Sequence, residues 1–164
     1  MTNKTIRGSI ACGMLALALG LVVPGQSASA QLQGNCKTVA GDWLDSLNAV
    51  GGTSGTITNG GMLNGSTETV YNPAFVLTLD PNVVSYIAET TVVTNHGDLK
   101  TSNVYLYNFV TGLGTAMGRI NPETSTGKFA GATGVLYFNT NTIGVFPDQS
   151  FASLITGEVC LATE

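Results

Sequence analysis

The sequence predicts an all-β protein, a closed antiparallel β-barrel of about eight strands with one short helix near its start. Residues that favour a pleated surface (Thr, Val, Tyr and Phe) are plentiful, whereas Lys and Glu, which favour helices, are sparse. Gly and Asn recur every several residues and mark turns. Many short strands separated by turns favour a barrel or, as the alternative, a sandwich.

The first 30 residues have the pattern of a secretory signal peptide. Lys4 and Arg7 precede an apolar run, Ala11–Val23, and Ala28-Ser29-Ala30 matches a signal-peptidase site. An uncleaved membrane anchor is the alternative, but the run has 13 residues, and a spanning helix needs roughly 20. We therefore expect cleavage after Ala30 and one secreted or periplasmic domain over residues 31–164.

Acidic residues outnumber basic ones, and the whole chain has a net charge of −4. Cleavage would leave four basic against ten acidic residues, a net charge of −6. This balance argues against nucleic acid and anionic membranes as partners, so we expect no membrane partner after cleavage. One His and three Cys are too few for a zinc or iron–sulfur site, and we expect no metal and no cofactor.

Two cysteines remain after cleavage, Cys36 and Cys160, one near each end of the domain. In an oxidising compartment such a pair predicts a disulfide, which requires the first and last strands to lie close together. A closed barrel or a sandwich allows this. Two unpaired buried thiols are the alternative, and neither Cys has neighbours that suggest a metal or catalytic role.

The helix is expected over Val39–Val50, VAGDWLDSLNAV. Its apolar residues recur at helical spacing, and Gly51-Gly52 ends it. Asp42 and Asp45 flank Trp43 and are expected on the solvent-exposed face of this helix.

The rest of the chain predicts strands, bounded by Gly, Asn and Pro residues that favour turns. The expected strands are Thr53–Thr58, Ser66–Tyr71, Ala74–Leu79, Val83–Thr94, Asn103–Val110, Thr115–Ile120, Gly134–Asn139 and Ser150–Leu161, and Met62-Leu63 is expected to begin the return to the second of them.

Two of these strands are apolar on both faces. Asn103–Val110 has Tyr105 and Tyr107 on one face and Val104 and Leu106 on the other, and Gly134–Asn139 shows the same pattern. A strand with one solvated face should alternate between apolar and polar residues. We therefore expect the outside of the sheet to be covered by the N-terminal helix, by a second sheet or by another subunit, and a homo-oligomer is our hypothesis.

Glycines punctuate the segment Thr126–Gly134, TGKFAGATG. Gly127, Gly131 and Gly134 are too closely spaced for a plain strand interior, and they indicate bulges or close backbone approach, with Phe129 as an apolar plug between them. A phosphate-binding loop is the alternative, but neither a following helix nor a Lys-Ser/Thr ending is present in the pattern.

Gly97–Leu161, and TGKFAGATG above all, resembles the allene oxide cyclase and dirigent-like β-barrel family. The resemblance implies a closed eight-stranded antiparallel barrel, often trimeric. This chain departs from the family pattern at Thr124-Ser125, where the family usually has Gly-Gly. No motif here matches the family's catalytic residues, so none is carried over.

Candidate site residues are few. Glu68 and Glu89 lie within expected strands, where a carboxylate inside a barrel could act as an acid or base or orient a ligand. Arg119, the only Arg after residue 30, could bind a ligand carboxylate or pair with Glu123 at the surface. The aromatic candidates for a pocket are Tyr71, Tyr86, Tyr105 and Tyr107, with core packing as their alternative use. His96 beside Asp98 is expected in an exposed turn, with a general-base pair as the alternative.

Three functions fit these observations. The first is a secreted barrel that binds a small apolar molecule in its lumen. The second is a structural or interaction protein with a fully packed barrel. The third is a cyclase or isomerase that works without a cofactor by confining its substrate. An open lumen lined by Tyr and a carboxylate would favour binding or catalysis, and a filled interior would favour the structural role.

Overall fold

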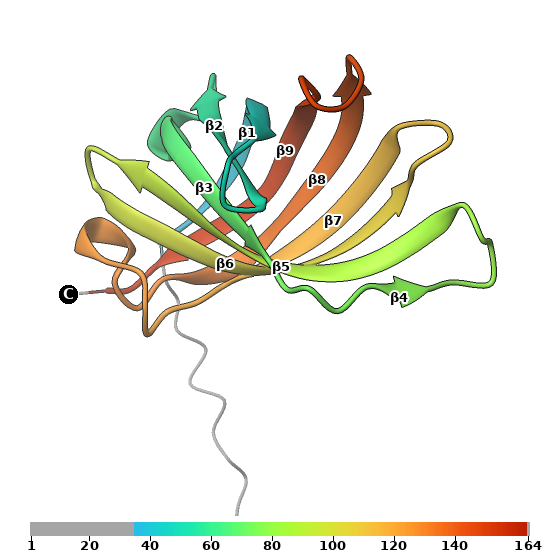
Figure 1. Cartoon of the computed structure of the whole chain (residues 1–164). Coiled ribbons are helices and arrows are strands. Elements are labelled where there is room, and N and C mark those ends of the chain that lie inside the picture. The colour runs from blue at the N-terminus through green and yellow to red at the C-terminus, as the bar shows by residue number, and fades with distance from the viewer. Residues whose placement is uncertain (1–34, 164) are drawn as a thin grey trace, which may run out of the picture. The chain divides into compact units, whose positions relative to one another are not determined.

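The computed structural model describes residues 35–163, and the expected signal peptide lies outside this range. Nine strands and two short 3-10 turns make up this part of the chain (Figure 1). They are β1 (Asn35–Leu47), β2 (Gly52–Thr58), η1 (Gly61–Leu63), β3 (Gly65–Tyr71), β4 (Val76–Leu77), β5 (Val83–Thr94), β6 (Gly97–Asn108), β7 (Leu113–Ile120), η2 (Gly127–Phe129), β8 (Thr133–Ile143) and β9 (Ser150–Leu161).

The strands form one antiparallel sheet in the order β3-β2-β1-β9-β8-β7-β6-β5-β4, and an additional pairing between β3 and β5 closes it. Eight strands therefore form the barrel, and β4 is a short extension on β5. The prediction of an all-β, closed antiparallel barrel is confirmed.

The expected helix over Val39–Val50 is wrong, because Asn35–Leu47 forms strand β1. This strand pairs with β2 on one side and with β9 on the other. The error has a simple cause. Val39, Trp43 and Leu47 lie four residues apart, and a spacing of four fits one face of a helix and equally one face of a strand.

The expected strand Ala74–Leu79 shortens to the two residues of β4. It pairs with β5 only at Ser85 and Val84, because β3 takes the same edge of β5 further along, from Ala88 to Thr94. The expected return at Met62-Leu63 is instead part of η1. The expected bounds of β5 and β9 are confirmed.

Cys36 and Cys160 form the predicted disulfide. They are direct partners in the β1–β9 ladder, and their Cα atoms lie 3.8 Å apart. The disulfide thus joins the first and last strands of the barrel, next to the point where the described chain begins and ends.

The barrel has two different ends. At the first, which we call the closed end, lie η1, η2 and the β5–β6 turn, seen at the left of Figure 1. Its interior is packed with fully buried apolar side chains, namely Leu63, Leu99, Ile120, Phe129, Leu136, Ile155 and Val159. The predicted plug role of Phe129 is confirmed. The backbone of Gly127, at a φ of 58°, lies against His96 and Gly97, where a Cβ would not fit.

The second end, which we call the mouth, holds the β1–β2, β3–β5, β6–β7 and β8–β9 connections. Between the mouth and the packed half lies a layer of hydrogen-bonded polar side chains. Asn103 Nδ2 donates to Thr90 Oγ1 at 2.9 Å, and the Thr90 and Thr69 hydroxyls are also 2.9 Å apart. This layer marks the boundary between the filled and the hollow parts of the barrel.

Apolar side chains also line the outer wall, as expected. Ile87, Val104, Met117 and Tyr137 are half exposed and are successive partners across β5, β6, β7 and β8. The predicted cover by an N-terminal helix is wrong, because that segment is a barrel strand. No second sheet occurs among residues 35–163, and cover by another subunit stays a prediction. Within the same residues, no helix has the length and apolar character needed to cross a membrane.

Candidate ligand-binding cavity

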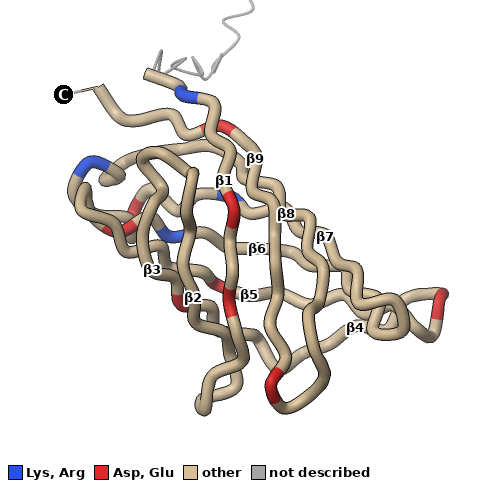
Figure 2. The backbone as a smooth tube through the Cα atoms, turned by 90° about the horizontal axis from the view of Figure 1, so that it is seen from above, with Lys and Arg blue, Asp and Glu red and all other residues tan. Residues whose placement is uncertain are grey.

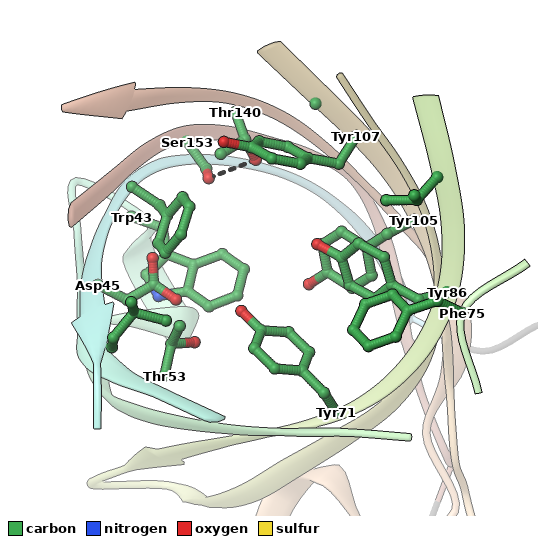
Figure 3. A pocket seen from close by; sticks show the side chains of 14 residues that line it. Trp43, Asp45, Thr53, Tyr71, Phe75, Tyr86, Tyr105, Tyr107, Thr140 and Ser153 are labelled. Carbon is green, nitrogen blue, oxygen red and sulfur yellow. Dashed lines mark hydrogen bonds between the residues drawn. The ribbon is translucent and has the colours of Figure 1, made fainter. Parts of the chain in front are cut away.

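A cavity of about 160 Å³ occupies the mouth half of the barrel. It forms because the side chains that face inward at this level come from nearly every strand and leave space between them (Figure 3). The cavity is lined by Trp43, Asp45, Leu47, Thr53, Tyr71, Phe75, Val84, Tyr86, Tyr105, Tyr107, Gly114, Thr140, Phe151 and Ser153.

One wall is aromatic. Tyr86 stacks on Tyr105 with ring centroids 4.9 Å apart and planes within 3°, and it also contacts Tyr71 edge to face at 5.4 Å. Phe75, from the segment before β4, packs against Tyr86 at 5.5 Å. Rings that contact one another in this way lose little freedom when a ligand binds, so they form a preorganised apolar surface.

The opposite wall is mixed (Figure 3). Trp43 is held by an edge-to-face contact with Phe138, at 5.4 Å, and by a 2.9 Å hydrogen bond from its Nε1 to Thr67 Oγ1. Beside it lie Asp45 and Thr53. This wall places a carboxyl and a hydroxyl group opposite the tyrosine rings.

Asp45 carries the one carboxyl group in the cavity lining, and only 6% of this residue is exposed. Burial raises the pKa of Asp45 from 3.8 to about 6, and the Thr53 hydroxyl offsets only part of that rise. Low solvation disfavours the carboxylate, because a charge loses more than a neutral group when water is removed. Asp45 can therefore hold or release a proton near neutral pH.

The tyrosine hydroxyls stay protonated. Burial is the main cause in each case: it raises the pKa of Tyr71 to about 12 and the pKa values of Tyr86 and Tyr105 further still. Tyr71 also shares Thr53 with Asp45 as a side-chain partner. The cavity thus offers neutral hydroxyl donors on one side and a titratable carboxyl group on the other.

Tyr107 is fixed at the entrance. Its hydroxyl lies 2.7 Å from Thr142 Oγ1 on β8 and accepts a hydrogen bond of 3.3 Å from Gln149 Nε2 in the β8–β9 connection. On the neighbouring strands, the Thr140 and Ser153 hydroxyls pair at 2.8 Å. These bonds hold β6, β8 and β9 together at the mouth and keep the entrance shaped.

The structure separates the seven candidate residues for a ligand site into two groups. The four tyrosines line the cavity, namely Tyr71, Tyr86, Tyr105 and Tyr107. Glu68, Glu89 and Arg119 are exposed and lie on the outward-facing positions of β3, β5 and β7, so they do not reach it. His96, whose expected turn position is confirmed, lies in the β5–β6 turn at the closed end, also away from the cavity.

Sequence reasoning placed Asp45 on an exposed helix face, which is wrong. The alternation Val39, Trp43, Asp45 and Leu47 on inward-facing positions of β1 was the available signal, but the polar Asp45 interrupted the apolar pattern. Thr53, at a buried position of β2, was missed for the same reason, because it too is polar.

A potential set of metal ligands lies elsewhere. Cys36, Glu158 and Cys160 bring three such atoms within 4.8 Å of one another. Both sulfur atoms are already bonded to each other in the disulfide, so the group does not offer thiolate ligands.

Comparisons of this chain with profiles of known protein families, with curated proteins and with solved structures find no match.

Proposed function

We propose that this protein binds a small, largely apolar molecule in the mouth half of its barrel. The observation that supports the proposal is the cavity itself. It is hollow, half of its lining residues are aromatic, and it has one titratable carboxyl group on its polar wall. A purely structural barrel would gain stability by filling this space, as the closed half does.

The volume limits the ligand. A cavity of about 150 Å³ is known to hold a benzene-sized molecule, and this one measures about 160 Å³. One six-membered ring, or the end of an acyl chain, fits the interior. A longer ligand would extend through the mouth towards solvent.

The polar wall determines which polar group of a ligand the cavity favours. Below a pH of about 6 the Asp45 carboxyl is protonated and donates a hydrogen bond, and above it the carboxylate only accepts. A hydroxyl group can both donate and accept, so an alcohol suits the site in either state. The proposed ligand is therefore an apolar ring or chain that carries a hydroxyl group.

The resemblance of Gly97–Leu161 to the allene oxide cyclase and dirigent-like barrels is consistent with this proposal, and we propose membership of that family. Secretion or export to the periplasm is likewise proposed, on the basis of the N-terminal pattern and of the disulfide, which is typical of oxidising compartments.

Trp43 provides the test, because it is the only Trp in the chain and it lines the cavity. Cyclohexanol, a single ring with one hydroxyl group, is titrated while Trp43 fluorescence is recorded. Glycerol, which has hydroxyl groups but no apolar ring, is the control. We expect a saturable change with cyclohexanol alone. No saturable change at any concentration that leaves the protein folded would contradict the proposal.

A matched pair of variants separates cavity binding from surface effects. Val84→Phe places a ring in the cavity, because Val84 lines it, and should abolish the saturable change. Val93→Phe makes the same substitution on the exposed, outward-facing side of the same strand and should preserve it. Equal binding by the two variants would show that the ligand lies elsewhere.

A second candidate function is favoured by Asp45. A carboxyl group with a pKa of about 6, facing neutral tyrosine hydroxyls, has the groups needed to move a proton without a cofactor. We propose isomerase or cyclase activity of this kind as the alternative. The probe is 2-cyclohexenone in D₂O: faster exchange of its acidic C–H protons with the wild type than with Asp45→Asn would support it, and equal rates would contradict it.

A further inference from the structure

The loops around the mouth carry a concentration of exposed apolar side chains. We call the connections 48–51, 72–82, 109–112 and 144–149 the rim. Each of them presents at least one such residue: Val50, Leu79, Val110 and Val145 are 81%, fully, 69% and 80% exposed. Further exposed apolar residues of the rim are Phe75, Val76, Leu77, Phe109 and Phe146.

Antiparallel topology places these four connections at the same end of the barrel, so their apolar tips surround the cavity opening. Phe75 belongs to both, because it is exposed on the rim and also lines the cavity. Isolated exposed apolar residues are ordinary on a protein surface, but a group gathered at one end marks an interaction site.

Basic residues are concentrated at the end of the barrel away from the rim. The four basic residues among positions 35–163 are Lys37, Lys100, Arg119 and Lys128, and all lie in the half of the barrel towards the closed end. The rim contains Asp80 and Asp148 and neither Lys nor Arg. Figure 2 shows this separation, with the loops farthest from the C-terminal end carrying acidic residues alone.

From these observations we infer that the rim docks the barrel, mouth first, on a lipid surface without net charge. Apolar tips on separate loops can each enter the interfacial region of a bilayer, where burial of apolar area drives binding. Anionic headgroups would repel Asp80 and Asp148, and no basic residue of the rim would attract them. A zwitterionic surface is the membrane that this combination fits.

The shape of the rim favours lipid over a second copy of this chain. A stable protein interface needs a continuous, complementary surface at its centre. Here the centre is the cavity opening, and the apolar side chains stand around it on loop tips. A fluid lipid surface conforms to such tips without needing a matching shape.

The sequence-based expectation of no membrane partner rested on net charge, which argues only against anionic membranes. Docking would also place the cavity opening against lipid. An apolar ligand would then pass between the bilayer and the cavity without crossing water. The docking itself does not require any ligand in the cavity.

The test is flotation with phosphatidylcholine vesicles. Leu79→Ser, Val110→Ser and Val145→Ser are combined in one rim variant, and none of these residues lines the cavity. The matched wall variant combines Val93→Ser, Val104→Ser and Leu154→Ser, which makes the same three changes at half-exposed positions on the outer wall. All three proteins are compared as residues 31–164, the form expected after cleavage, so that the apolar run Ala11–Val23 does not contribute to flotation.

We expect the wild type and the wall variant to float with the vesicles, with little dependence on salt, and the rim variant to partition at least about tenfold less. Replacing part of the phosphatidylcholine with phosphatidylserine should weaken binding. Absence of wild-type flotation, equal flotation of the rim variant, or binding only to anionic vesicles would each overturn the inference. So would a concentration-dependent dimer in sedimentation that the rim variant abolishes, because a second copy would then occupy the rim.

Discussion

Ionisation of Asp45 should make the stability of this protein depend on pH in a way that one substitution removes. The pKa of Asp45 is raised from 3.8 to about 6 in the folded barrel, because burial disfavours the carboxylate. The folded state therefore holds this proton more tightly than the unfolded chain does. The contribution of Asp45 to stability is therefore greatest below a pH of about 4, falls as the pH rises to about 6, and is lost above that value.

The size of the effect follows from the shift. A raise from 3.8 to about 6, at about 1.4 kcal/mol per pKa unit, corresponds to a loss of about 3 kcal/mol. Asp45→Asn keeps the shape of the side chain and removes its ionisation. We expect the unfolding free energy of the wild type to fall by about 2.5 kcal/mol relative to that of Asp45→Asn between pH 4 and pH 7, because a small part of the loss already occurs below pH 4.

Urea unfolding at several pH values, followed by the fluorescence of Trp43, measures this difference directly. The matched control is Asp42→Asn, which makes the same change on the exposed face of the same strand. This variant still carries Asp45, so it should keep the fall in stability between pH 4 and pH 7. If the stability curves of the wild type and Asp45→Asn run parallel from pH 4 to pH 7, Asp45 is not a buried titrating group and the description of the polar wall is wrong.

Three further outcomes follow from the fold. Replacing both Cys36 and Cys160 with Ser should lower the unfolding free energy by about 5 kcal/mol on the chain-entropy account, given their separation of 124 residues, while the circular dichroism spectrum stays that of a β-sheet protein. Phe129→Ala should cost about 3–5 kcal/mol in urea unfolding, because its side chain is fully buried at the closed end, and a loss under about 1 kcal/mol would contradict the plug role. If a second copy covers the outer wall, the wild type should sediment as an oligomer and Met117→Glu as a monomer, whereas a monomeric wild type at micromolar concentration would reject that hypothesis.

Strands whose type and ends follow from the local sequence were predicted correctly, whereas strands that depend on pairing with distant segments were not. β5 is rich in β-branched residues and lies between two turn signals, and β9 directly follows one, and the ends of both strands lie where the sequence predicted them. β1 contains a repeat of four, which fits a helix and a strand equally, and only its pairing with β2 and β9 decides between them. β4 was overestimated because competition with β3 for the edge of β5 is not visible in the local sequence.

The site was predictable only in part, for a related reason. Strand alternation correctly grouped Tyr105 and Tyr107 on one face of β6, but it did not show which face points inward. Closure of the barrel decides that, and it turns Glu68 and Glu89 outward and Asp45 inward. A polar residue inside a barrel interrupts the apolar pattern that identifies a buried face, so the residue of greatest chemical interest was the hardest to predict.

The most direct test of the central claim is an NMR titration of the isotope-labelled protein with cyclohexanol. The claim predicts saturable shifts of the Trp43 indole N–H and the Gly114 amide, which belong to cavity-lining residues. The amides of Leu136 and Val159, packed in the closed half, should stay unchanged. Shifts that never saturate, or that spread equally over both halves of the barrel, would contradict a binding cavity at the mouth.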